Sequence, residues 1–221
     1  MAKPRVPETD HGIVGEFEVA AYDEMQRRFR DKGWIQTSQI LKNGITRGSA
    51  LEIGPGPGYL GLEWLKSTQG TTLTGLDISS DMIAIARRNA EKYGLADRVE
   101  YVESGASTMP FSDAAFDAVF TNGSLHEWAD PKSTFGEIWR VLKPKGKIFV
   151  SDVRRDISPS VRRLLSIRTR SAEMRACFDS SVAAAYTPGE LADLVKGTPL
   201  EGCSVSGTPF GLVLVGTKHE E

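Results

Sequence analysis

The chain has little cysteine and no long apolar run, and both shortages limit the kind of protein it can be. Its 221 residues include two cysteines, Cys177 and Cys203, which lie far apart and lack a CxxC partner. A disulfide framework and a zinc site are therefore not indicated, and a reducing compartment is expected. No apolar run approaches the ~20 residues that span a membrane, and no apolar segment indicating a secretion signal follows Met1–Arg5. We therefore expect a cytoplasmic protein without an integral membrane segment.

The chain also lacks an excess of charge of either sign. Lys and Arg number 27 and Asp and Glu 29, which gives a net charge of −2. This balance gives no argument for a nucleic-acid partner or for an anionic membrane surface. Apolar residues at 40% and charged residues at 25% are ordinary for a globular protein of one domain. We expect no nucleic acid among the partners, and a homodimer is left open.

What the chain does contain is a regular alternation of short apolar segments and amphipathic helices over residues 48–153. The expected strands are 50–53, 71–77, 99–103, 116–120 and 147–153, and the expected helices are 57–67, 81–92 and 131–142. This alternation predicts a parallel sheet with helices on both faces. The segments 203–207 and 211–217, joined by a short link, predict an antiparallel hairpin at the sheet edge. The fold class is therefore α/β, a Rossmann-like sheet of seven mostly parallel strands with a C-terminal antiparallel hairpin.

We interpret residues 1–221 as a single domain with a helical lid. Its expected parts are an N-terminal helical cap (1–47), a core (48–153), a helical insert or lid (154–186), and a last helix with the hairpin (187–221). A long helix is expected over residues 158–177. Thr187 and Glu190 form a capping-box pattern that begins the last helix. The spacing of apolar residues, Phe17 among them, predicts a helix over residues 14–30, and Ala84 is expected to face inward on the helix 81–92.

The segment Glu52–Gly58, which reads EIGPGPG, is the most informative stretch of the chain. Its three glycines at alternate positions, between an apolar strand and an apolar-periodic helix, predict a tight loop that a ligand can approach closely. Pro57 suits the first turn of the following helix. Asp77 ends the second strand, 23 positions after Gly54. A carboxylate at that place can accept both hydroxyls of a ribose, although Asp77 could also serve only the start of the next helix.

Four segments in order extend this pattern into a family resemblance. They are Leu51–Gly58, Gly75–Ser79, Met109–Asp113 with Phe116–Val119, and Glu137–Gly146. Together they resemble the class I S-adenosylmethionine-dependent methyltransferases, in the branch that includes the ubiquinone and menaquinone biosynthesis methyltransferases. The resemblance implies in-line transfer of a methyl group from S-adenosylmethionine to a small-molecule acceptor, with S-adenosylhomocysteine as product. Such chemistry depends mainly on positioning, and no metal is expected.

The resemblance also implies cofactor contacts at the positions that match the family. These are Glu52, Gly54, Gly56 and Gly58 at the methionine part, Asp77 at the ribose, Ile78 and Met82 at the adenine, and Asn122 beside the methionine part. Glu52 could offset the positive charges of the cofactor. For Ile78 and Met82, packing in the core is an equally good interpretation.

One departure from the family pattern concerns adenine. Members usually carry an aspartate after the third strand, and Gly105 stands at that place here. We expect the backbone of Ala106, or the side chain of Ser104 or Ser107, to contact the adenine instead.

Five further residues are candidates for the acceptor side. His126, which follows the fourth strand, could act as a general base because imidazole titrates near neutral pH, or could bond within its own loop. Tyr186 is a second catalytic candidate. Tyr22, Arg154 and Arg155 are substrate candidates, with packing or surface ion pairs as the alternative.

Two other functions remain open at this point. A nicotinamide-dependent oxidoreductase also uses a glycine loop and a ribose-binding acid, but its third glycine follows the second by three positions rather than two. A non-catalytic regulatory module that binds S-adenosylmethionine would account for the missing aspartate.

Overall fold

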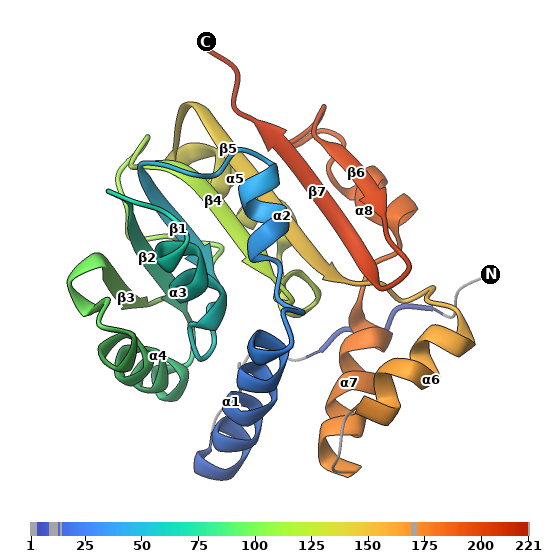
Figure 1. The fold of residues 1–221 in the computed structure, drawn as a ribbon. Coiled ribbons are helices and arrows are strands. Elements are labelled where there is room, and N and C mark those ends of the chain that lie inside the picture. Colours follow the sequence, from blue (N-terminus) through green and yellow to red (C-terminus); the bar gives the residue numbers. More distant parts are fainter. Residues whose placement is uncertain (1–3, 9–12, 14, 169–171, 221) are drawn as a thin grey trace.

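The computed structural model describes residues 4–8, 13, 15–168 and 172–220. The chain forms a seven-stranded sheet with the strand order β3-β2-β1-β4-β5-β7-β6 (Figure 1). The strands are β1 (Ser49–Ile53), β2 (Thr72–Asp77), β3 (Val99–Glu103), β4 (Phe116–Asn122), β5 (Leu142–Val153), β6 (Ser204–Gly207) and β7 (Gly211–Thr217). The first five strands pair in parallel, whereas β7 runs antiparallel to both β5 and β6. The predicted fold class, with its C-terminal antiparallel hairpin, is confirmed.

Helices cover both faces of this sheet. They are α1 (Glu16–Asp31), α2 (Thr37–Lys42), α3 (Tyr59–Lys66), α4 (Ser80–Tyr93), α5 (Pro131–Val141), α6 (Pro159–Arg168), α7 (Ala172–Ala184) and α8 (Pro188–Leu194), with the short 3-10 turns η1 (Ala96–Arg98) and η2 (Leu125–Glu127). Because side chains alternate along a strand, Leu51 of β1 packs with α5 and α8, whereas its neighbour Ala50 packs with α2 and α3. Trp64 of α3 is fully buried on that second face and donates to the Ile45 carbonyl at 2.8 Å.

The parallel strands bring several loops to one edge of the sheet. The first loop follows β1, and Gly54 N donates to the Leu76 carbonyl at 2.8 Å, which ties the loop to the end of β2. Figure 1 shows α1, α6 and α7 beyond this carboxyl-terminal edge, on the side where ligands bind in open α/β sheets. Among the described residues, no helix combines the length and the apolar composition needed to cross a lipid bilayer.

Some local predictions were wrong. Helix α3 begins at Tyr59, with Gly58 as its N-cap, so Pro57 lies in the loop and not in the first helical turn. Ala84 is exposed, whereas Ile85 and Ala86 of the same helix are buried. The helix expected over residues 14–30 is observed as α1, where Phe17 is 72% exposed because α1 lies beyond the strand ends and buries only Val19. Apolar spacing places residues on a common helix face, but it does not say how much of that face is covered.

The insert after β5 forms two described helices, α6 and α7. The single helix expected over residues 158–177 crosses 169–171, which lie outside the described residues. Helix α8 begins as its sequence predicts: Thr187 Oγ1 accepts from Glu190 N at 3.2 Å, and Glu190 Oε2 accepts from Thr187 N at 2.8 Å. This reciprocal pair satisfies two backbone donors that a helix start leaves without a partner.

Candidate active site

The glycine loop turns sharply at three left-handed positions. Gly54, Gly56 and Gly58 have φ of 64°, 51° and 84°, a region that residues with a side chain rarely adopt. Space is also limited, because a Cβ at Gly54 would lie 2.7 Å from Ser124 Cβ, and one at Gly58 would lie 2.6 Å from the Tyr101 hydroxyl. The loop therefore requires glycine for both backbone conformation and packing.

Asp77 holds the opposite side of this loop. Its Oδ2 accepts from Gly56 N at 3.0 Å and its Oδ1 accepts from Ser79 N at 2.9 Å. Burial raises the pKa of Asp77, although the backbone donors of Ser79 and Gly56 act in the opposite direction. The carboxylate thus connects the loop after β1 with the start of α4, where Ser79 caps the helix by accepting from Met82 N at 3.2 Å.

Glu52 lies behind the loop rather than in it. It is 2% exposed, and its Oε2 finds no hydrogen-bond partner of normal geometry among the described residues, although the backbone of Gly61 lies close enough to lower its pKa. Burial, and then the charge of Asp77, raise the pKa of Glu52 to about 8. Glu52 therefore holds a proton at neutral pH, and a nearby positive ligand would favour its ionised form.

A cavity opens between the glycine loop, the end of β2 and the segment after β4. The predicted site residues in its lining are Tyr22, Gly54, Gly56, Asp77, Ile78, Met82, Ser104, Gly105, Ala106 and Ser107. Lining residues that the sequence analysis did not assign to the site are Ile13, Ile53, Leu76, Gly123, Ser124, Glu127, Trp128, Ala129, Asp130 and Thr134. Within the described part of the chain, the predicted residues outside this lining are Glu52, Gly58, Asn122, His126, Arg154, Arg155 and Tyr186.

The cavity lining combines apolar and polar side chains. Ile78 is 50% exposed at the end next to Asp77, and Met82 is 2% exposed below it. A Cβ added to Gly105 would meet no heavy atom within 4 Å, so this position has room for a side chain. Tyr22 and Glu127 add polar atoms to the same lining. The Tyr22 hydroxyl accepts from Gln26 Nε2 at 2.9 Å, and burial raises the pKa of Tyr22.

His126 forms a buried pair with Asp152 at the end of β5. His126 Nδ1 lies 2.9 Å and 3.0 Å from the two carboxylate oxygens of Asp152, and His126 N donates to Asp152 Oδ2 at 2.8 Å. Burial lowers the pKa of His126, but the charge and hydrogen bond of Asp152, together with Glu8 and Glu127, raise it to about 10. A raised pKa disfavours a general base at neutral pH, and the catalytic role of His126 stays a prediction.

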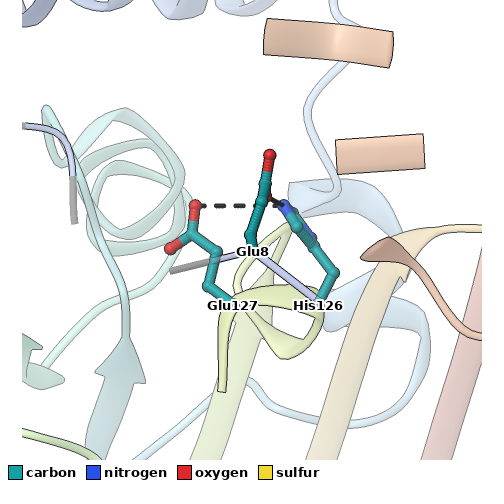
Figure 2. Close-up of side chains that lie close together, drawn as sticks. All are labelled: Glu8, His126 and Glu127. Atoms are coloured by element: carbon teal, nitrogen blue, oxygen red, sulfur yellow. Dashed lines mark ion pairs between the residues drawn. The ribbon is translucent and has the colours of Figure 1, made fainter. Parts of the chain in front are cut away.

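Two glutamates flank the other nitrogen of this imidazole (Figure 2). His126 Nε2 lies 3.3 Å from Glu8 Oε2 and 3.8 Å from Glu127 Oε1. The Glu127 side chain is 38% exposed, and Glu127 is one of the residues that line the cavity. Burial, then the charges of Glu8, Asp152 and Asp77, raise the pKa of Glu127 to about 7 against the lowering effect of His126. Burial raises the pKa of Glu8, but the contact and charge of His126, together with hydrogen bonds to Ser180 and Ser181, lower it below its usual value.

The N-terminal segment that carries Glu8 is tied to the insert. Val6 N donates to the Ala183 carbonyl at 3.0 Å. Arg5 donates to the Ala184 and His126 carbonyls and stacks over the ring of Tyr186 at 4.3 Å. Tyr186, predicted as catalytic, is thus half-buried against Arg5 and outside the cavity lining.

The remaining candidates make contacts away from the cavity. Asn122 Oδ1 accepts from the Ser151 hydroxyl at 2.8 Å. Arg154 pairs with Asp156 and donates to the Thr208 carbonyl. Arg155 is 5% exposed, pairs with Glu190 and donates to the Ala185 carbonyl. Arg154 thus connects the end of β5 to the hairpin, and Arg155 connects it to α8. These contacts correspond to the ion pairs that the sequence analysis gave as their alternative role.

Sequence reasoning missed Glu127, Asp152 as the partner of His126, and Glu8. Glu127 follows His126 directly, so its position in the same loop was a usable signal. Asp152 ends β5 beside β4, and the parallel pairing of these strands brings it to His126. Nothing in the sequence pattern indicated Glu8, because only the docking of the N-terminal segment brings it to the site.

Comparisons with known proteins agree with this geometry. The family model described as a methyltransferase domain matches residues 51–150. An uncharacterized methyltransferase of Bacillus subtilis, YdaC, is 32% identical over 139 residues, which cover 62% of this chain and 75% of that protein. A demethylmenaquinone methyltransferase of Thermus thermophilus is 39% identical over 100 residues, covering 45% of this chain and 44% of its own length. The chain thus spans less than half the length of that second relative.

A crystal structure of an S-adenosylmethionine-dependent methyltransferase from Aquifex aeolicus has the same fold. Its TM-score is 0.70 at 17% identity, covering 93% of this chain and 99% of that one. The chain belongs to the methyltransferases, and its fold is that of an S-adenosylmethionine-dependent methyltransferase. The comparisons do not favour the oxidoreductase or the non-catalytic module.

Proposed function

We propose that this chain transfers the methyl group of S-adenosylmethionine to a small organic acceptor. One observation carries the proposal: Gly54, Gly56 and Asp77 line one cavity, and the Gly56 N–H donates to the Asp77 carboxylate. This is where a class I enzyme needs close backbone approach and an acceptor for ribose hydroxyls. Because the chain spans only part of its relatives, its acceptor does not follow from their names.

The space around the glycine loop supports a fit of these residues to the cofactor. A Cβ at Gly54 would meet Ser124, and one at Gly56 would lie 3.3 Å from Tyr22, so the missing side chains leave the cavity wall open. We propose that Asp77 holds the ribose, that Ile78 and Met82 contact the adenine, and that the backbone of Gly105 and Ala106 closes that end. Glu52 would support the loop from behind and lower the cost of a positive charge nearby.

The cofactor supplies a methyl group on a positively charged sulfur, which a nucleophilic atom of the acceptor can displace in line. The contribution of the chain is to bind and orient both partners and to keep water out. We assign the acceptor to the end of the cavity lined by Tyr22, Glu127 and Trp128. The insert at 154–186 and the cap at 1–47 would cover it as a lid. His126 and Tyr186 remain candidates for taking the acceptor's proton, and Arg154 and Arg155 for contacting it from the lid side.

Calorimetric titration with S-adenosylmethionine and with S-adenosylhomocysteine tests this function. We expect both to bind, and NADH not to bind. Incubation with cofactor labelled in the methyl group and a small-molecule extract should then move label into the organic fraction and form S-adenosylhomocysteine. Absence of cofactor binding would contradict the proposal, and cofactor binding without transfer would favour the regulatory module. A cytoplasmic location and a homodimer stay predictions, for cell fractionation and analytical ultracentrifugation to test.

A further inference from the structure

We propose that Glu8, His126 and Glu127 form a binding site for one divalent transition-metal ion. These residues come from the N-terminal segment and from η2, and one ligand atom of each lies within 4.8 Å of the others (Figure 2). None of the four segments that carry the family resemblance contains them.

The first argument is the way His126 is held. Its Nδ1 lies 2.9 Å from Asp152 Oδ1, and the imidazole side chain is 5% exposed. A histidine that ligates a metal through one nitrogen commonly donates its other N–H to a carboxylate, which fixes the tautomer and the orientation of the ring. Asp152 occupies that supporting place, so Nε2 is the nitrogen directed at the two glutamates.

The second argument is the state of Nε2. It is buried, and among the described residues its nearest carboxylate oxygens, Glu8 Oε2 at 3.3 Å and Glu127 Oε1 at 3.8 Å, lie beyond the usual length of a hydrogen bond. Ligand atoms about 2.1 Å from a common ion in tetrahedral geometry are roughly 3.4 Å apart. The separations are therefore those of ligands around an ion, and too loose for direct hydrogen bonds of good geometry.

The third argument is charge. Three carboxylates, of Glu8, Glu127 and Asp152, surround one imidazole, so they outnumber the single positive charge that a protonated His126 carries. The nearby guanidinium of Arg5 is engaged with the backbone carbonyls of His126 and Ala184 and does not offset them directly. A divalent ion would balance this charge. One imidazole with two carboxylates suits Mn²⁺, Fe²⁺ or Zn²⁺ better than Mg²⁺ or Ca²⁺, which prefer oxygen ligands alone.

The position of the site indicates a use, which rests on the proposed function. Glu127 lines the cavity at the end assigned to the acceptor. A metal ion held there would have coordination positions left for a hydroxyl or thiol of the acceptor and would favour its ionised, nucleophilic form. The acceptor class implied is a small molecule with an oxygen or sulfur donor that can bind a metal.

Titration of the full chain with MnCl₂ and with ZnCl₂, without S-adenosylmethionine, tests the site. We expect one ion per chain by calorimetry and a bound Mn²⁺ signal by electron paramagnetic resonance. Glu8→Gln, Glu127→Gln and His126→Gln should each weaken binding at least tenfold, whereas the exposed Glu91→Gln on α4 should not. Because His126→Gln leaves Asp152 without its partner, the two glutamate variants decide the question if that variant does not fold.

Three results would overturn the metal site. They are no binding of either ion, binding that Glu8→Gln and Glu127→Gln leave unchanged, and thermal stabilisation by ethylammonium but by neither metal ion, which would assign the cluster to an organic cation. The methyl-transfer assay is run separately with and without EDTA. Transfer without metal binding would contradict the metal site alone, and metal binding without cofactor binding would contradict the proposed function alone.

Discussion

The edge of the sheet has two halves that are built in different ways. The glycine-loop half follows β1, β2 and β3 and contains Gly54, Asp77 and Gly105. Its parts hold one another directly, as Gly56 N donates to Asp77 at 3.0 Å. The histidine half follows β4 and β5 and consists of His126, Glu127, Asp152 and Glu8. Its parts come from η2, the end of β5 and the N-terminal segment.

This difference indicates how one fold can retain its cofactor site while its acceptor site changes. The glycine-loop half depends on backbone conformation and on short connections between neighbouring strands. The histidine half depends on the docking of a distant segment, held by Val6 and Arg5 against residues 183–184. We therefore expect changes in the first half to act on cofactor affinity and core stability, and changes in the second to act on metal and acceptor.

The largest effect is expected from Asp77→Ala. This change removes the carboxylate that accepts from Gly56 N and that we assign to the ribose. Affinity for S-adenosylmethionine should fall on the order of 100- to 1000-fold by calorimetry, about 3–4 kcal/mol. The exposed Asp97→Ala in η1 is the matched control. Mn²⁺ binding should be unaffected by either change, and a joint loss of both ligands in Asp77→Ala would remove the distinction between the halves.

The next effect concerns pH and Glu52. Its pKa is raised from about 4.5 to about 8, so the folded state binds a proton that the unfolded state releases. The free energy of unfolding should therefore decrease as pH rises from about 5 to 8, by on the order of 2–3 kcal/mol. Glu52→Gln should flatten this dependence in urea unfolding measured at several pH values. Equal slopes for the two proteins would show that Glu52 is not the group responsible.

A smaller effect distinguishes the cost of a steric clash from the cost of a strained backbone at two loop glycines. Gly54 and Gly123 both have positive φ, but only at Gly54 would a Cβ meet another atom closely. Gly123→Ala should cost on the order of 1 kcal/mol from backbone conformation alone. Gly54→Ala should cost about 1–3 kcal/mol more, because Ser124 must move. Thermal unfolding of both variants measures the difference, and equal destabilisation would show that the contact with Ser124 is relieved easily.

The smallest expected effect is a gain. Gly105 occupies the place where the family usually carries an aspartate, and it has room for a side chain. Gly105→Asp should restore an acceptor for the adenine amino group and tighten S-adenosylmethionine binding by about fivefold, roughly 1 kcal/mol. Gly105→Ala, which fills space without an acceptor, should not tighten it. Weaker binding in the aspartate variant would place the adenine elsewhere in the cavity.

The sequence predicted the sheet well because each strand ends at a local signal. Gly211–Thr217 was predicted with its observed bounds, and Thr187 caps α8 as its pattern indicates. The inward face of α4 was predicted less well, since Ala84 is exposed whereas Ile83 and Ala90 are buried. Periodicity describes one helix, whereas burial depends on what packs against it.

The candidate site divides in the same way. The glycine loop and Asp77 were found from spacing. For Arg154 and Arg155 the sequence left open whether they contact the substrate or form surface ion pairs. In the structure they pair with Asp156 and Glu190. The pair of His126 and Asp152 required knowledge that β4 lies beside β5. Glu8 required the docked N-terminal segment.

The sequence by itself determined the order of strands and helices, the left-handed loop and the acid at the end of β2, because these depend on backbone conformation and on residues close in the chain. Only the tertiary structure decided that Glu52 is buried, which raises its pKa, and that Glu8, Glu127 and Asp152 meet at one imidazole. Burial and charge act through space, so their effect on a side chain is fixed only once distant segments pack together.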